Sequence, residues 1–420
     1  MAYTDFIAAI DLGTSHMVGM VGTKNATGAL SIIAYEVENS GTCIRRGCVY
    51  NVKETASKIK RLILKLENKL GGTKIGQVYV GLGGQSLRSI EHTVCKVLGM
   101  EGVVTEEIID SLYQECKDYR PDMLTVLDVV SPSYFLDDKP ESNPVGVPCS
   151  RIEARYKLIV GRPSLKLNIV NSISEQAKIE IAGILVSPLA LGDVVLSDNE
   201  KDLGCALIGF GAGVTTISVY KGGKLASLSV VPFGGNLITK DITNLRVVES
   251  EAERLKITYG SAKADRDNDM TIQVSLADGM GLREIKLAEL NGVIEARMDE
   301  ILENVYARLE ATGLMSVLGA GIVITGGGAA LKNLPAVMSE RLKMEVRYSA
   351  VRKGVVASGD LVVASNPEYA VAVGLLAKGT KNCALYIPPK PEPKIEPVVE
   401  PEPTAVSYTH LRAHETEADL

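Results

Sequence analysis

Two glycine-containing turns carry the residues best suited to bind a charged ligand. One spans residues 11–16 and the other spans residues 209–214, and each follows an apolar run. A strand that turns sharply through glycine leaves successive backbone N–H groups pointing into one concavity, and such concavities bind phosphate oxygens. We expect the two turns to hold one polyphosphate from opposite sides. The residues expected there are Gly13, Thr14, Ser15, His16, Gly211, Ala212, Gly213 and Val214.

Asp11 stands at the mouth of the first turn. Its carboxylate is suited to hold Mg²⁺ through water, because Mg²⁺ prefers to keep several of its waters. Either turn alone indicates little, since glycine is common in hairpins. The duplication of the turn is what favours a shared site.

The duplication extends along the chain. Residues 7–18 can be laid over residues 205–216, so that Asp11 falls on Gly209. Each copy predicts a strand, a glycine turn, a second strand, another turn and a third strand. Two copies of one such unit predict two similar α/β domains.

Two further motifs suit a sugar and a base. Glu253 and Lys256 are three apart on an expected helix and can hydrogen-bond ribose hydroxyls; a solvated salt bridge is the alternative. Gly326, Gly327 and Gly328 can admit a flat base against bare backbone. An ordinary turn from strand to helix is the alternative for these glycines.

The composition limits the class of protein. A chain of 420 residues suits two or three domains, and a formal net charge of −6 excludes a broadly basic protein, so we expect no nucleic-acid partner. The scattered cysteines contain no Cys-x-x-Cys pair, which disfavours a disulfide framework or zinc site and favours a reducing cytosol. The uncharged residues 203–220 and 311–331 contain glycine clusters, which predict buried strands rather than membrane spans.

Apolar residues at helical spacing predict helices over residues 53–70, 174–185, 249–257, 287–309 and 367–377. The first of these helices has a basic face, for which we favour packing on a sheet over contact with an acidic membrane. Residues 76–161 differ, with short strands, a helix at 105–117 and a proline-rich loop. We expect a separate insert there, and its four prolines within residues 132–148 predict that the loop contains no long regular element.

Together these residues resemble the superfamily of actin, heat-shock chaperones and sugar kinases, and within it the FtsA family of actin-like bacterial cell-division proteins. The resemblance covers residues 5–380. It implies an α/β fold of two duplicated actin-like (ribonuclease H-like) domains around a nucleotide cleft, with a small inserted α+β subdomain. Segments similar to the family's motifs are residues 11–15, 204–223, 231–242, 252–256, 324–328 and 369–379. The third segment adds Gly234 and Gly235 to the expected nucleotide contacts.

The insert distinguishes this family from actin, the chaperones and MreB. The boundaries implied by the resemblance are 1–76 for the first part of domain I, 77–162 for the inserted subdomain, 163–202 for the second part of domain I, 203–362 for domain II, 363–387 for the closing helix of domain I, 388–404 for a proline-rich linker and 405–420 for a tail. The composition changes abruptly after Thr404. We therefore expect the tail not to be native to the chain.

The resemblance implies an ATP-binding scaffold, with Mg²⁺ as second cofactor, that polymerises and links the FtsZ ring to the membrane. The implied location is cytoplasmic, peripheral on the inner face of the membrane at the division site. In this family the C-terminal peptide of FtsZ docks near a Glu-x-Arg-x-x-Glu helix, which Glu295, Arg297 and Glu300 match; an exposed helix face is the alternative. The family binds membrane through a C-terminal amphipathic helix, which we expect to be absent here because residues 405–420 are acidic.

Three positions depart from the family pattern. Gly209 and Thr216 stand where the family usually has acidic residues that organise Mg²⁺ and the attacking water, so we expect at most a weak ATPase. His16 stands where the family generally has lysine. A sugar-kinase-like phosphotransferase and an actin-like assembly factor for pili or other membrane machinery are the alternative functions. The missing carboxylate at residue 209 disfavours the kinase.

Overall fold

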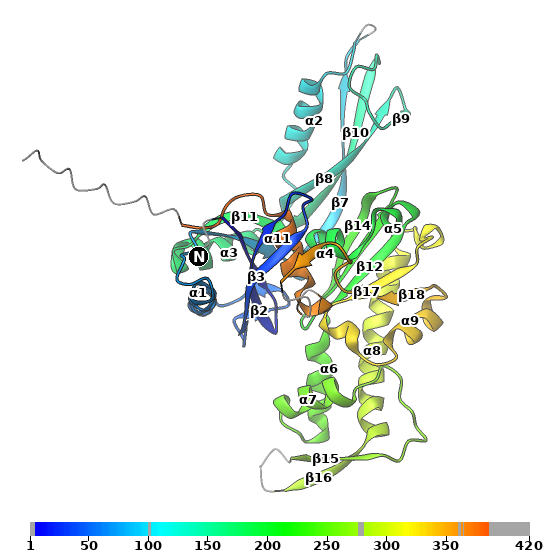
Figure 1. The fold of residues 1–420 in the computed structure, drawn as a ribbon. Helices are drawn as coiled ribbons and strands as arrows, with labels where there is room; N and C mark the ends of the chain where they lie inside the picture. The colour runs from blue at the N-terminus through cyan, green and yellow to red at the C-terminus, as the bar shows by residue number, and fades with distance from the viewer. Residues whose placement is uncertain (1–4, 100–101, 276–280, 360–362, 364, 386–420) are drawn as a thin grey trace, which may run out of the picture. The chain divides into compact units, whose positions relative to one another are not determined.

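The computed structural model describes residues 5–99, 102–275, 281–359, 363 and 365–385. The linker and the tail expected at residues 388–404 and 405–420 lie outside these ranges. Within them, two large sheets repeat one strand arrangement, and a further sheet is inserted into the first domain (Figure 1). Among the described residues, no helix is both long enough and apolar enough to cross a bilayer.

The first sheet has the strand order β11-β6-β1-β2-β3-β19. Its strands in chain order are β1 (Ile7–Leu12), β2 (His16–Lys24), β3 (Leu30–Asn39), β6 (Gln77–Leu82), β11 (Glu180–Val186) and β19 (Val356–Ser358). Strand β1 lies inside the sheet, antiparallel to β2 and parallel to β6. It is almost wholly buried, which explains its continuous apolar sequence.

The second sheet has the order β14-β13-β12-β17-β18. Its strands are β12 (Cys205–Phe210), β13 (Thr215–Lys221), β14 (Lys224–Val231), β17 (Ile322–Thr325) and β18 (Val346–Tyr348). In the first hairpin Asp11 is paired with Val18, and in the second Gly209 is paired with Thr216. The two hairpins therefore share one register, which confirms the duplication predicted from the sequence.

Helix α1 (Val52–Lys69) packs on the first sheet, and Asn51 caps its N-terminus. Its basic face pairs with β3, where Lys65 and Arg61 contact Glu38 at 2.9 and 2.6 Å. These bonds, the one from Lys65 above all, hold the pKa of Glu38 below its usual range. The interpretation of this face as the outer side of a helix packed on a sheet is confirmed.

Other helices in the described part of the chain are α3 (Ser164–Val170), α4 (Ser187–Val195), α5 (Asp198–Leu203), α6 (Gly235–Ile242), α7 (Glu249–Tyr259), α8 (Leu287–Glu310), α9 (Leu334–Leu342) and α11 (Ala370–Lys378). Short two-stranded sheets are formed by β4 (Ile44–Arg45) with β5 (Cys48–Val49) and by β15 (Thr271–Ser275) with β16 (Leu282–Lys286). The helices expected at 249–257, 287–309 and 367–377 are confirmed.

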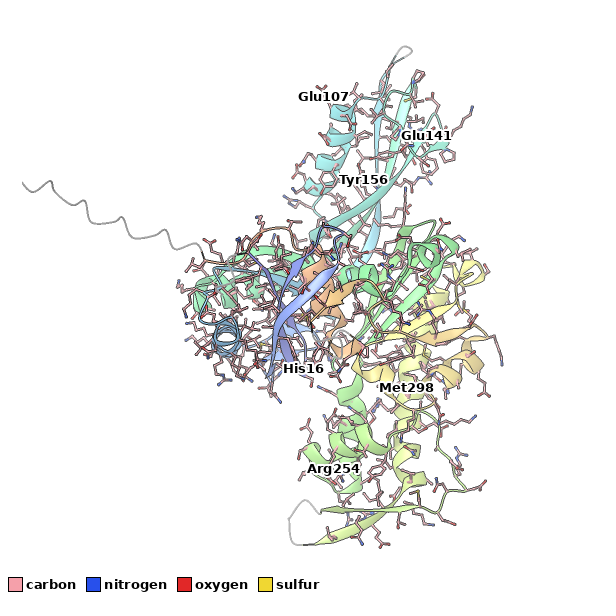
Figure 2. All side chains as sticks on the ribbon, viewed as in Figure 1. His16, Glu107, Glu141, Tyr156, Arg254 and Met298 are labelled. Carbon is pink, nitrogen blue, oxygen red and sulfur yellow. The ribbon has the colours of Figure 1, made fainter. Side chains whose placement is uncertain are left out.

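The inserted sheet consists of β7 (Arg88–Val97), β8 (Thr125–Leu136), β9 (Lys139–Glu141) and β10 (Arg151–Gly161), and α2 (Glu106–Asp118) packs on it. Tyr156 lies in its core (Figure 2). The expectation that proline would exclude long elements here is wrong, because β8 contains Pro132. This proline lies where the pairing with β10 shifts register between Arg155 and Lys157, and a bulge tolerates a residue without an N–H.

Two domain boundaries and one helix differ from the expected ones. Residues 77–82 form β6 of the first sheet, so the inserted sheet begins at β7 rather than at residue 77. Strand β19 pairs with β3, so the chain returns to the first sheet before residue 362. The helix expected at 174–185 is wrong, because a π-helical turn ends at Lys178 (φ 61°) and strand β11 follows. Gly183 in this strand packs against the ring of Tyr79, which a larger residue would displace.

Candidate functional site

The two glycine turns meet. A Cβ atom built on Gly213 would lie 2.5 Å from Thr14 Oγ1, so only a glycine allows the second turn to approach the first this closely. A cavity of about 260 Å³ lies between the turns and is lined by both. Two segments about two hundred residues apart in sequence thus form opposite walls of one cleft.

The first turn is fixed from behind by buried Ser40. The Ser40 hydroxyl donates to the carbonyl oxygen of Gly13 at 2.7 Å, and the Ser40 amide donates to that of Ser15 at 2.9 Å. The hydroxyl of Thr14 accepts from Gly47 N–H at 2.9 Å. Because the carbonyl and amide of a trans peptide point in opposite directions, the Thr14 amide points away from Ser40.

The second turn is fixed from behind by the start of α6. The amide of Gly235 donates to Gly211 O at 3.0 Å, and that of Asn236 donates to Ala212 O at 2.8 Å. By the same rule the amides of Ala212 and Gly213 point away from α6. Two carbonyl oxygens of each turn are therefore occupied by these supports, and the amides of Thr14, Ala212 and Gly213 are left to meet a ligand in the cleft.

Asp11 lies at the end of β1 and lines the cleft. Burial raises the pKa of its carboxyl to about 6, against the lowering effect of a hydrogen bond from the Leu12 backbone. The space around it exists because Gly81 on β6 lacks a side chain: a Cβ there would lie 3.2 Å from Asp11 Oδ1 and 2.6 Å from Ser187 Oγ. The fold thus places an isolated carboxylate beside the first turn, at a cost in desolvation.

Gly209 occupies the position in the second copy that Asp11 occupies in the first. A Cβ atom at Gly209 would lie 2.7 Å from Thr216 Oγ1 and 3.3 Å from Leu191. Glycine at 209 and threonine at 216 therefore fit each other. The two departures from the family pattern, Gly209 and Thr216, are therefore neighbours that pack against each other.

Glu253 and Lys256 lie on α7 and line the cleft, as expected. Lys256 Nζ contacts Glu253 Oε2 at 2.7 Å, Thr239 Oγ1 at 2.8 Å and Gly235 O at 3.2 Å. Thr239 also donates to Glu253. The pair is thus a salt bridge in the wall of the cleft, where the glutamate side chain is 42% exposed and available to a ligand.

The glycines that follow β17 form another part of the wall. Gly326 has φ +88°, and a Cβ there would lie 2.6 Å from the carbonyl oxygen of Phe210. A Cβ on Gly327 would lie 3.0 Å from Glu368 Oε1. These glycines bring bare backbone against β12 and against the segment before α11, which suits a flat ligand group.

The cleft collects nearly all of the residues expected from the sequence. The exception is Gly234, which does not line the cleft but packs beneath the second turn. A Cβ atom built on Gly234 would lie 2.5 Å from the carbonyl oxygen of Gly211. His16 lies at the start of β2 (Figure 2) and lines the cleft. Its ring has an edge contact with the ring of Tyr369, with 6.5 Å between the centroids.

Other residues of the lining were missed. Among them are Gly47, Gly81, Ser187, Asn236 and Glu368. Asn236 directly follows Gly235 in a segment already singled out, and the others come from elements whose position depends on sheet order or helix packing. Gly83 and Gly84 also line the cleft, and the proximity of Gly81 to Asp11 is a consequence of β6 pairing with β1.

The expected partner motif lies on α8. Arg297 forms ion pairs with Asp241 on α6 and with Glu300, and these bonds, the one to Asp241 above all, raise its pKa. Glu295 lies 4.0 Å from Arg266. The three residues are half-buried rather than on a fully exposed face, and Arg297 is held by two carboxylates.

Comparison with known proteins shows the fold first. The structure resembles that of a PilM-PilN type IV pilus biogenesis complex (TM-score 0.62, 16% identity, covering 88% of this chain and 97% of that one). It also resembles a MamK double helical filament (TM-score 0.51, 12% identity, covering 88% and 97%). Such low identities show the fold alone. Together with the paired hairpins they define an actin-like protein with two duplicated α/β domains.

The sequence comparisons are more specific. The model of the cell division protein FtsA family matches residues 206–374. The cell division protein FtsA of Porphyromonas gingivalis is 39% identical over 90% of this chain and 79% of its own length. The FtsA of Bacillus subtilis is 32% identical over 92% of this chain and 86% of its own length. The FtsA of Escherichia coli K12 is 29% identical over 90% of each chain. The chain belongs to the FtsA family of cell division proteins.

Proposed function

We propose that this protein is an ATP-binding scaffold of bacterial cell division. It binds ATP with Mg²⁺ between the two hairpin turns, self-associates, and links FtsZ to the inner face of the cytoplasmic membrane. The observation that supports nucleotide binding is the contact between Gly213 and Thr14, which brings two sets of backbone amides to one cleft.

The residues of the cleft fit the nucleotide and the cation. The turns at residues 13–16 and 211–214 would hold the phosphates, Glu253 and Lys256 the ribose, and Gly326 to Gly328 the base. No group of three or more acidic, His or Cys side chains that could hold a metal is found among the described residues. Asp11 would therefore hold Mg²⁺ together with water and phosphate oxygens, where the cation would neutralise phosphate charge.

Hydrolysis in this scaffold is weak or absent. The reason is that Gly209 and Thr216 supply no carboxylate to position water, and phosphoryl transfer depends on such positioning. Binding needs only the amides and the cation, so it is retained. The test is titration of purified protein with a fluorescent ATP analogue, followed by a phosphate-release assay. Failure to bind would overturn the proposal, and fast phosphate release would overturn its description as a scaffold.

The FtsZ C-terminal peptide would dock around Glu295, Arg297 and Glu300. Because Asp241 and Glu300 already hold Arg297, we expect this arginine mainly to shape the surface between α6 and α8. The measurement is fluorescence anisotropy of a labelled FtsZ C-terminal peptide with wild type and Arg297→Ala. Arg254→Ala is the matched control, because Arg254 pairs with Glu251 on α7. Equal binding by the Arg297 and Arg254 variants would reject this docking site.

The alternative functions have direct tests. Release of ADP that depends on added sugars or polyols would indicate a kinase. The likeness to the PilM-PilN complex concerns the fold and does not by itself favour a role in pili. Pelleting assays with ATP test self-association, and failure to pellet under any nucleotide condition would argue against the polymer.

A further inference from the structure

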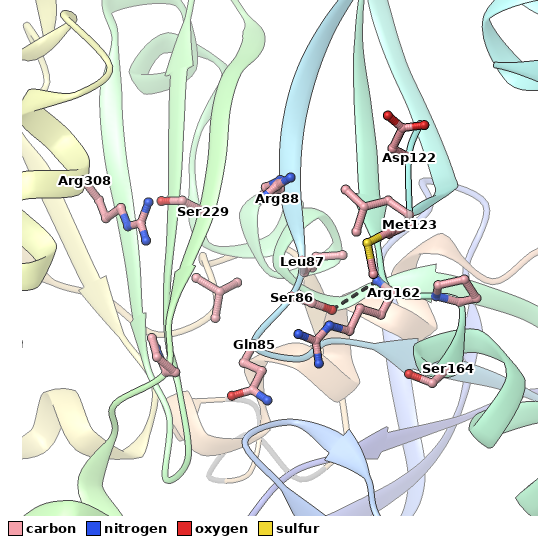
Figure 3. Close-up of a pocket in the computed structure, with 14 residues that line it drawn as sticks. Gln85, Ser86, Leu87, Arg88, Asp122, Met123, Arg162, Ser164, Ser229 and Arg308 are labelled. Carbon is pink, nitrogen blue, oxygen red and sulfur yellow. Dashed lines mark hydrogen bonds between the residues drawn. The ribbon is translucent and has the colours of Figure 1, made fainter. Parts of the chain in front are cut away.

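A second hollow lies apart from the nucleotide cleft. It has a volume of about 810 Å³ and shares no lining residue with the cleft (Figure 3). Its walls come from the base of the inserted sheet, from the loop before α3, and from β14 and α8 of the second domain. Pro232 of the segment 231–242 also lines it, but none of the residues assigned to the nucleotide, the cation or the FtsZ peptide does.

Three arginines line this hollow: Arg88 at the start of β7, Arg162 directly after β10, and Arg308 near the end of α8. Figure 3 shows the Arg162 and Arg308 side chains directed into the hollow from opposite walls. None of the three guanidinium groups has an ionic or hydrogen-bonded partner within the part of the chain that the structure describes. Asp122 is the acidic residue of the lining, so the cations outnumber the anions.

Hydroxyl groups add further donors. Ser86 Oγ accepts from the Arg162 amide at 3.2 Å, which leaves its O–H available to donate (Figure 3). Ser164 and Ser229 also belong to the lining. A concave surface with guanidinium forks and hydroxyls, and without a fixed counter-ion, attracts tetrahedral oxyanions.

The two walls are joined beside the arginines. Ser89 Oγ accepts from Leu228 N–H at 2.8 Å, and Lys224 Nζ donates to Pro132 O at 2.6 Å. Ser89 adjoins Arg88, and Leu228 adjoins Ser229. These hydrogen bonds tie the inserted sheet to β14 beside the hollow, so an anion placed there meets arginines from both domains.

We infer that this hollow binds a phosphate-bearing ligand with at least two phosphate groups, which Arg88 and Arg162 contact from one wall and Arg308 from the other. A planar carboxylate accepts one guanidinium fork, whereas an oligophosphate presents oxygens in several directions and matches cations on opposite walls. The ligand is either a soluble oligophosphate or the headgroups of an anionic phospholipid, which share this chemistry.

The experiment measures pyrophosphate binding by calorimetry at low salt, and flotation with phosphatidylglycerol vesicles against phosphatidylcholine vesicles. Wild type is compared with Arg162→Gln/Arg308→Gln, whose exposed side chains can be changed without loss of the fold, as circular dichroism will verify. Lys60→Gln, an exposed change on α1, is the matched control. Gly213→Ala reports on the nucleotide cleft.

We expect the double arginine variant to bind at least about tenfold more weakly, since each charge-assisted bond contributes appreciably to affinity. Lys60→Gln retains binding. If the double arginine variant loses pyrophosphate binding in calorimetry, the ligand is a soluble oligophosphate. If it loses only flotation with phosphatidylglycerol vesicles, the ligand is a lipid headgroup. The inference would be overturned if wild type binds neither pyrophosphate nor phosphatidylglycerol vesicles. It would also be overturned if Gly213→Ala abolishes binding while the double arginine variant retains it.

Discussion

The two copies of the glycine hairpin share a backbone and differ in what their side chains do. In the first, Asp11 is paired with Val18 and its carboxyl has a pKa raised by burial to about 6. In the second, Gly209 is paired with Thr216 and leaves no room for a side chain. The first hairpin therefore carries a carboxylate, and at the equivalent position of the second hairpin the packing of Thr216 leaves no space for one.

The supports behind the turns differ as well. Ser40 holds the first turn through its amide and its hydroxyl, whereas amides at the start of α6 hold the second. Different neighbours thus produce the same result, with turn carbonyls occupied and amides turned away. The two copies therefore share a backbone geometry, and the carboxylate is confined to the first copy.

The largest effect is expected where the copies touch. Gly213→Ala would place Cβ within 2.5–2.9 Å of three Thr14 side-chain atoms, and Gly47 N–H holds that threonine in place. We expect roughly a hundredfold weaker ATP binding, from overpacking of up to about 3 kcal/mol. Titration with a fluorescent analogue is the measurement. Gly83→Ala is the control, because Gly83 lines the same cleft with open space at its Cβ. Equal losses in both variants would show that the contact does not matter.

The second test concerns the carboxylate of the first copy. The raised pKa of Asp11 means that its charged form is disfavoured in the folded protein, so stability is lost as pH rises through about 6. Asp11→Asn should therefore gain stability relative to wild type as the pH rises from 4 to 8, reaching about 3 kcal/mol, since the pKa is raised from 3.8 to about 6 and one pKa unit corresponds to about 1.4 kcal/mol. Chemical denaturation in EDTA at several pH values measures it.

Glu38→Gln is a control of opposite sign. Bonds to Lys65 and Arg61 lower the pKa of Glu38, so its contribution is present at neutral pH and lost as pH falls through the folded pKa. The Glu38 variant should therefore be less stable than wild type at pH 7, and the difference should shrink in acid. Parallel pH profiles for the two variants would show that Asp11 is not destabilised by burial.

Local pattern predicted most of this architecture. The repeated strand-turn-strand unit, α1, α7, α8 and the amide turns all follow from residues close together in sequence. The strand at 180–186 was mistaken for a helix because its apolar residues fit either period, and its pairing with β6 decides the outcome. The effect of Pro132 could not be predicted from local sequence either. The bulge that allows this proline inside β8 depends on the pairing of β8 with β10.

The site divides in the same way. Residues in the glycine motifs were found because the chemistry is local. Gly81, Ser187 and Glu368 reach the cleft only through sheet order and the packing of α11, which no short motif encodes. The mutual fit of Gly209 and Thr216 also depends on strand pairing, so the sequence showed two departures where the structure shows one arrangement.

A third test restores the missing carboxylate in the second copy. Gly209→Asp should destabilise the protein by about 1–2 kcal/mol, because its Cβ meets Thr216 Oγ1 and a β-branched side chain moves little. Gly209→Asp/Thr216→Ala removes that obstruction and should recover most of the stability. Thermal denaturation measures both, and phosphate release from the double variant then shows whether a second carboxylate increases hydrolysis. If Gly209→Asp alone is as stable as wild type, the second hairpin has space for a side chain at residue 209.

The smallest effect is expected at His16, which stands in the first copy where the second copy has Val214. His16 lines the cleft, and lysine there would bring a fixed positive charge to the phosphates at neutral pH. His16→Lys should bind ATP about fivefold more tightly at low salt, and the gain should shrink as salt screens the added charge. His92→Lys is the matched control, because His92 stacks on Tyr119 at 4.0 Å in the inserted subdomain and not in the cleft. Unchanged affinity in His16→Lys would mean that His16 acts through its contact with Tyr369 alone, and that the backbone amides of the two turns already satisfy the phosphates.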